Sequence, residues 1–218
     1  MPFDNVGRPG PGRGAGERAI NLPPTVLWLI VVNVIVQVAR SVLLSDDADI
    51  ALIQQFGFVP AAYTGSSADL LSQVAAPITY QFLHGGWMHL VVNMVSLAAF
   101  GAPVERLLGG RRFLLFYLSA GIVAGVVHAV LSPSSIEPVI GASGAISGVF
   151  GGVLMLLRRV GSLTSLLPVA AVWIGLNVFF GLVGGTPGAD GEQVAWVAHI
   201  GGFVYGLAAI RLFMPRQE

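Results

Sequence analysis

A serine and a histidine far apart in the chain are the residues best suited to chemistry. Ser143 lies in the turn Gly141-Ala142-Ser143-Gly144, inside a long uncharged stretch, and His199 lies in the last such stretch. A glycine-rich turn exposes the nucleophilic serine of many hydrolases, and a neutral histidine within bonding reach can accept its proton. The pair predicts a hydrolase that works below the surface of a bilayer, in a cavity that admits water.

Further polar side chains lie at a similar depth in the apolar stretches. Counted back from the cytoplasmic helix ends, Ser143, His199 and His89 lie roughly 18 to 22 Å along their helices. His89 and Asn93 are four residues apart on one helix face, and they can donate to a developing oxyanion together with the backbone N–H of Ser143. His84 lies near the outer mouth, where it either adds a donor or braces the loop.

Acidic residues and cysteines add nothing at this depth. Glu105 and Glu137 lie at the ends of apolar stretches, so Ser143 and His199 are predicted to act as a dyad without a carboxylate. The chain has no cysteine, which excludes disulfides and thiolate metal sites. We expect no metal and no organic cofactor. Nucleic acid is not an expected partner either, because no basic face is long enough to follow a row of phosphates.

The composition requires a membrane to hold these residues. Of 218 residues, 55% are hydrophobic and only 10% are charged, against roughly 25% charged in soluble domains. The charges are gathered between six long uncharged runs: Ile20–Ala39, Leu70–Val104, Phe113–Ile136, Pro138–Leu157, Val160–Ala189 and Gln193–Ile210. Since about 20 apolar residues cross the hydrocarbon core, these runs predict an all-α bundle of six transmembrane helices.

Arginines indicate the orientation of this bundle, because the chain has no lysine. They cluster before the first run, after the second and fourth runs and at the C-terminal end, whereas the alternate loops are acidic apart from Arg40. The positive-inside rule then places both termini in the cytoplasm. We expect a disordered basic tail over residues 1–19, a six-helix domain over 20–213 and a short tail over 214–218.

One loop, from about Ser45 to Ala76, is long, and this orientation places it outside. Its middle is apolar but too short to span the bilayer. It is either an interfacial segment partly inserted and packed on the helices, or an ordinary amphipathic loop.

Small residues accompany the reactive ones, and the spacing Gly202-x-x-x-Gly206 is typical of close helix contacts. Four motifs stand out: Gly141-Ala142-Ser143-Gly144, Ala198-His199-x-x-Gly202-x-x-x-Gly206, His84-Gly85-Gly86-Trp87-Met88-His89-Leu90-Val91-Val92-Asn93 and Gly101-Ala102-Pro103-Val104-Glu105-Arg106. Together these motifs resemble the rhomboid family of intramembrane serine proteases. The resemblance extends from about Pro24 to Ile210.

The resemblance implies a role for each residue. Ser143 would be the nucleophile, His199 the general base, and His89 with Asn93 the oxyanion donors. The implied substrate is a membrane-anchored protein cut in or near its transmembrane segment at a small residue. The expected location is the bacterial plasma membrane, with the lipid bilayer as the other partner.

Further motif residues are interpreted as structural. Gly141, Gly144, Gly202 and Gly206 would allow close packing. Glu105 with Arg106 would anchor a helix end and its loop on the cytoplasmic side.

Two departures from the family pattern stand out. Many relatives carry a tyrosine one turn after the nucleophile, where it stacks on the catalytic histidine, but this chain has Ser147. Either another group, such as an aromatic side chain, holds the His199 ring, or the ring is held more loosely. The long outward loop also lacks the Trp-Arg pair found in some members.

Two other functions fit parts of the pattern. A catalytically silent rhomboid-like protein that binds transmembrane helices would keep the fold, although such relatives typically lose the serine or the histidine. A small transporter would use the histidines as a proton relay. That function predicts acidic groups at mid-depth and an internal repeat, and the sequence shows neither.

Substrate entry is expected along the fifth apolar run. Its wall would open around Trp173, Phe179, Phe180 and Gly181, with the loop Gly184–Gly191 as a cap. His128, which no motif surrounds, is interpreted as a structural hydrogen-bond partner.

Overall fold

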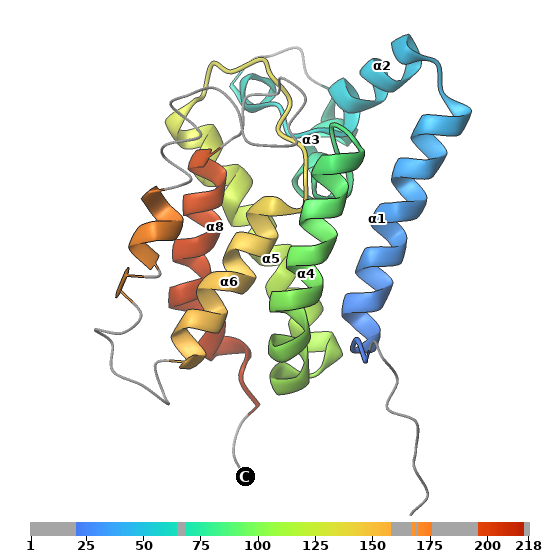
Figure 1. The fold of residues 1–218 in the computed structure, drawn as a ribbon. Helices are drawn as coiled ribbons and strands as arrows, with labels where there is room; N and C mark the ends of the chain where they lie inside the picture. Colours follow the sequence, from blue (N-terminus) through green and yellow to red (C-terminus); the bar gives the residue numbers. More distant parts are fainter. Residues whose placement is uncertain (1–20, 65–68, 158–166, 169, 176–195, 216–218) are drawn as a thin grey trace, which may run out of the picture.

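The computed structural model describes residues 21–64, 69–157, 167–168, 170–175 and 196–215, and this part of the chain is an all-α bundle (Figure 1). The predicted fold class, all-α and membrane-embedded, is confirmed in these residues. Four of their helical segments are long and apolar enough to cross a membrane: α1 (Pro24–Leu43), α4 (Trp87–Leu108), α5 (Gly110–Leu131), and α8 (Trp196–Ala209) continued by the 3-10 turn η3 (Ile210–Phe213). A shorter apolar helix, α6 (Ser143–Leu157), packs among them.

The segment from Ser45 to Phe82, which includes the predicted long loop, is folded into short helices at one end of the bundle (Figure 1). It contains α2 (Asp46–Phe56), η1 (Pro60–Tyr63), α3 (Leu70–Thr79) and η2 (Tyr80–Phe82). Side chains cap both α-helices. Oγ of Ser45 accepts a hydrogen bond from the N–H of Ala48, and Oδ2 of Asp69 accepts one from the N–H of Ser72. The bonds from Ser72 also hold the pKa of the Asp69 carboxyl below its usual range.

The run Leu70–Val104 holds one crossing helix, as predicted, but its N-terminal part does not belong to that helix. This run forms α3, then η2, and only then the long helix α4. The break follows from local chemistry, since Pro77 cannot donate a backbone N–H inside α3 and the pair Gly85-Gly86 favours an extended connection. The spanning helix therefore begins at Trp87, two residues before His89.

The run Pro138–Leu157 is also helical only in part. Residues 138–140 have no helical structure and include the β-bridge residue Val139, residues 141–142 form a bend and a turn, and α6 begins at Ser143. Most of the run Val160–Ala189 lies outside the described residues, although 167–168 and 170–175 are helical. The expected tail over residues 1–19 lies outside them too.

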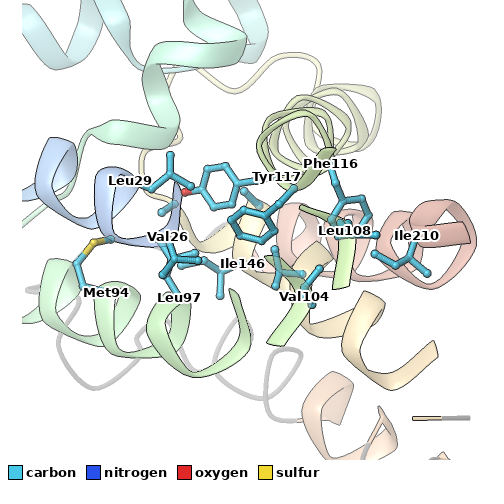
Figure 2. Close-up of a cluster of buried hydrophobic side chains, with 14 of the residues drawn as sticks. Val26, Leu29, Met94, Leu97, Val104, Leu108, Phe116, Tyr117, Ile146 and Ile210 are labelled. Carbon is cyan, nitrogen blue, oxygen red and sulfur yellow. The ribbon is translucent and has the colours of Figure 1, made fainter. Parts of the chain in front are cut away.

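An apolar core fills the space between α1, α4, α5 and α6 (Figure 2). Val26, Leu29, Leu97 and Phe116 are fully buried there. The outer surface is apolar as well. Large side chains exposed on α1, α4 and η3 include Trp28, Ile35, Val42, Val95 and Leu212. An apolar interior beneath an apolar exterior indicates that lipid, not water, covers these helices.

Glycines allow α6 and α8 to approach until their backbones touch. A Cβ at Gly202 would overlap the carbonyl oxygen of Gly144, and one at Gly206 would overlap that of Gly148. On the other side of α6, a Cβ at Gly144 would lie 2.8 Å from that of Ala124 on α5. The packing role predicted for Gly144, Gly202 and Gly206 agrees with this geometry.

The opposite end of the bundle is held by a buried carboxylate. Glu105 on α4 accepts hydrogen bonds from the backbone N–H groups of Thr25 (2.9 Å) and Val26 (2.7 Å), in the first turn of α1. The neighbouring Arg106 donates to the carbonyl of Asn21. A carboxylate at a helix N-terminus satisfies unpaired amides and complements the helix dipole.

We predict that Gly206→Ala lowers the thermal unfolding midpoint of the purified protein. The added Cβ must push α8 away from the Gly148 carbonyl, at a cost of about 1 to 3 kcal/mol. Gly175→Ala is the matched control, because a Cβ at Gly175 has nothing within 4 Å among the residues that the structure describes. Equal midpoints for the two variants in detergent would show that the contact between α6 and α8 is looser than described.

Candidate active site

Ser143 and His199 meet across the contact between α6 and α8. The Oγ of Ser143 lies 2.7 Å from Nε2 of His199, although 56 residues separate them in the chain. Both side chains are half-buried. If Nε2 accepts the hydroxyl proton, the ring proton of His199 must be on Nδ1. This arrangement is that of a nucleophile beside its base.

An extended segment delivers Ser143 to this position. Phe58 and Val139 exchange two backbone hydrogen bonds of 3.0 and 2.9 Å, and the N–H of Gly141 donates to the carbonyl of Tyr80 at 2.9 Å. Gly141 has φ of 118°, which only glycine adopts readily. The chain then turns directly into α6. These backbone bonds satisfy irregular peptide groups that would otherwise be costly in a membrane.

The N-terminus of α6 adds a positive partial charge at the serine. The N–H of Ile146 donates to the carbonyl of Ala142, so the helix begins at Ser143. The first amides of an α-helix have no partner within the helix, and the dipole of the helix favours negative charge beside them. The backbone N–H of Ser143 is thus oriented by the helix itself.

His89 lies beside the serine, on the first turn of α4. A Cβ built on Gly141 would be 2.9 Å from Nε2 of His89 and 3.5 Å from Oγ of Ser143, so one small space borders both side chains. The N–H of Gly85 donates to Nδ1 of His89 across 3.4 Å. A neutral imidazole that accepts at Nδ1 carries its proton on Nε2, on the side of Gly141. His89 can therefore donate toward the reacting group.

Asn93 follows one turn later on the same face of α4 and is buried. Its Nδ2 donates to the backbone carbonyl of His89 at 2.9 Å. A carboxamide has two N–H groups, so this bond leaves Asn93 a second donor. The structure brings His89 near Ser143, while the Asn93 amide in this state supports His89.

His84 is fully buried behind His89. The two rings meet edge to face with centroids 5.1 Å apart, and neither ring nitrogen of His84 has a hydrogen-bond partner among the described residues. The His84 carbonyl accepts a 2.7 Å bond from Nη1 of Arg40. The residue pattern at depth did not point to Arg40. The available signal was its position as the one arginine that breaks the charge rule.

Trp173, one residue of the expected substrate-entry wall, packs against α6 and α8. Trp173 stacks on Phe203 with centroids 4.7 Å apart and contacts Phe150 at 5.8 Å. The rest of the expected entry wall, Phe179, Phe180 and Gly181, lies outside the described residues, as does the loop Gly184–Gly191. Ser147 is buried on α6, one turn beyond Ser143.

Comparison with known proteins agrees with this architecture. Residues 71–216 match the rhomboid domain. The chain is 34% identical over 148 residues to RHOMBOID-like protein 4 of Arabidopsis thaliana, with 63% of the chain and 34% of that protein aligned. It is 37% identical over 143 residues to Rhomboid protease GluP of Bacillus subtilis, with 62% and 25% aligned.

A fungal relative gives the same result over a longer stretch. Rhomboid-type serine protease 2 of Emericella nidulans is 33% identical over 174 residues, with 75% of this chain and 33% of that protein aligned. The chain thus spans between a quarter and about a third of the relatives described here. The matched domain covers most of the helices that form the site. This multi-pass membrane protein belongs to the rhomboid family.

Proposed function

We propose that this chain is an intramembrane serine endopeptidase that cleaves membrane-anchored proteins through a Ser143–His199 dyad. The observation that carries the proposal is the 2.7 Å contact between Oγ of Ser143 and Nε2 of His199. Family membership supports it, because relatives from a bacterium and a fungus bear protease names. A silent helix-binding protein would have no need to keep a nucleophile and its base in bonding contact.

The chemistry follows from the two side chains. The Ser143 hydroxyl attacks the carbonyl carbon of the scissile peptide bond while Nε2 of His199 takes its proton. The tetrahedral intermediate collapses as the C–N bond breaks and His199 returns the proton to the leaving amine. The acyl group is then bound to Ser143, and a water molecule activated by His199 hydrolyses that ester. Neither a metal nor an organic cofactor has a part in these steps.

The developing oxyanion would be stabilised from two sides. The N–H of Ser143 approaches from the N-terminus of α6, and Nε2–H of His89 approaches from α4. The second N–H of Asn93, which its bond to the His89 carbonyl leaves available, would complete the set. Donors that are already oriented at the place where charge develops act strongly, because they need no rearrangement during the reaction.

We further propose six transmembrane helices, with the domain division 1–19, 20–213 and 214–218 and with both termini in the cytoplasm. The arginine pattern supports this orientation, since Arg40, its one exception, is buried and bonded to Asp49. The substrate would be a membrane-anchored protein with a small residue at the cut, and the location a bacterial plasma membrane.

Removing either member of the dyad should abolish cleavage. We expect Ser143→Ala and His199→Ala to lower kcat by at least about 1000-fold, because each removes the nucleophile or its base. The measurement is cleavage of a membrane-anchored reporter with a small residue at the cut site, in detergent. Ser147→Ala, one turn along α6, and His128→Ala are the matched controls. A folded Ser143→Ala protein that still cleaves would exclude this site.

His89→Ala should lower kcat by about 100- to 1000-fold, the usual effect of one lost oxyanion donor, with KM changed by less than about threefold. Asn93→Ala should reduce kcat as well, because its amide supports His89 and supplies the remaining donor. Steady-state kinetics on the same reporter give both constants. Wild-type kcat in the His89 variant would remove this residue from the mechanism.

The absence of cysteine permits a direct test of topology. In intact cells, a membrane-impermeant maleimide should label Asp47→Cys on α2, whereas Glu218→Cys should react only after the membrane is permeabilised. The parent chain is the unlabelled control. Labelling of both cysteines from outside would overturn the proposed orientation.

A further inference from the structure

Arg40 is a charged residue enclosed near the outer end of α1. Its side chain is only 6% exposed. Nε and Nη2 donate to the two carboxylate oxygens of Asp49 on α2, at 2.7 and 2.9 Å. Nη1 donates to the backbone carbonyl of His84 at 2.7 Å and to the side-chain oxygen of Gln37 at 3.3 Å. One guanidinium thus joins α1, α2 and the segment that precedes α4.

This arrangement uses properties that are special to arginine. The planar fork matches a carboxylate with two parallel bonds and still has a donor aimed elsewhere. A buried cation is tolerated only when its charge is balanced, and Asp49 supplies that balance. Asp49 therefore fixes the plane of the guanidinium, and the guanidinium fixes the carbonyl of His84.

The His84 carbonyl that Arg40 binds belongs to the same peptide group as the N–H that orients His89. The next residue, Gly85, donates its N–H to Nδ1 of His89. Gly85 and Gly86 have no side chains to restrain their backbone, so this segment depends on contacts from elsewhere. With Nδ1 held as an acceptor, the ring proton of His89 faces Gly141 and Ser143. A series of hydrogen bonds thus leads from Asp49 to the His89 ring, which borders the same small space beside Gly141 as Ser143 does.

We infer that Arg40, balanced by Asp49, is a positioning residue that keeps Nε2–H of His89 directed at the oxyanion. The inference rests on the proposed function, because it assigns a supporting role around the same serine. Arg40 touches neither substrate nor the reacting atoms. It acts through the His84 carbonyl and the Gly85 N–H, and it couples the outward helix α2 to the rate of the chemical step.

The kinetic test replaces Arg40 or Asp49 and measures kcat and KM separately on the membrane-anchored reporter. We expect Arg40→Gln to lower kcat by about 10- to 100-fold, as small displacements of catalytic groups do, with KM within about threefold of wild type. Arg40→Lys should recover part of the loss, because an ammonium can reach the carbonyl but lacks the fork. Asp49→Asn should lower kcat, and Asp47→Asn, exposed on the same helix, should not.

Two further variants separate positioning from folding. Glu105→Gln weakens the buried contact with α1 sixteen residues along α4, roughly 24 Å from His89, so it should lower stability while kcat stays unchanged. If Arg40→Gln fails to fold, the double variant Arg40→Gln/Asp49→Asn removes both charges together and takes its place. A kcat within twofold of wild type in folded Arg40 variants, or an equal loss in Glu105→Gln at equal stability, would overturn the inference.

A second readout does not depend on activity. In protein labelled with ¹⁵N-histidine, the nitrogen shifts of His89 distinguish an accepting Nδ1 from a protonated one, and comparison with His89→Gln assigns the signals among four histidines. Wild type should show the proton on Nε2, and Arg40→Gln should show a mixture. Unchanged His89 shifts in Arg40→Gln would refute the positioning role of Arg40. If the wild-type protein does not cleave the reporter, but the His89 shifts still differ in this way between wild type and Arg40→Gln, the protease proposal alone is refuted.

Discussion

The contact between the backbones of α6 and α8 is the constraint on which the site depends. A serine side chain is short, so its hydroxyl can reach a histidine on another helix only if the two helices lie unusually close. Helices with ordinary side chains between them pack roughly 8 to 10 Å apart. Here Gly202 and Gly206 lie directly against carbonyls of α6, and no side chain could be inserted. The 2.7 Å bond between Ser143 and His199 follows from that proximity.

The interior of the bundle is divided between an apolar half and a polar half. On the buried face of α1, Val26 and Leu29 are followed by Asn33, Gln37 and Arg40. The apolar half packs against the core and holds the helices together. The polar half lies toward the end where Ser143 and His89 lie, and its donors are bonded there: Asn33 donates to the carbonyl of Leu29, and Arg40 donates to Asp49 and to the carbonyl of His84. Stability and chemistry are thus assigned to opposite ends of the same helices.

Sequence reasoning succeeded where helices are regular and failed where the backbone departs from them. The matching depths of Ser143 and His199 follow from counting residues along helices, and the two side chains do lie in contact. Hydropathy predicted the all-α membrane class because long apolar runs form regular helices in a bilayer. It could not predict the break before Trp87 or the non-helical residues 138–142, because apolar composition alone does not distinguish helical from non-helical backbone. The environment of Arg40 required tertiary contacts that no local pattern encodes.

The pairing of Phe58 with Val139 limits how this region can change over evolutionary time. Two reciprocal backbone bonds and the bond from Gly141 to Tyr80 set the alignment of the segment that ends at Ser143. Substituting a side chain there leaves the alignment intact. Inserting or deleting a single residue would shift it by one position, turn side chains to the opposite face and leave enclosed peptide groups without partners. Descendants of this protein should therefore vary in residue type along the segment, except at Gly141 with its positive φ, while its length stays constant.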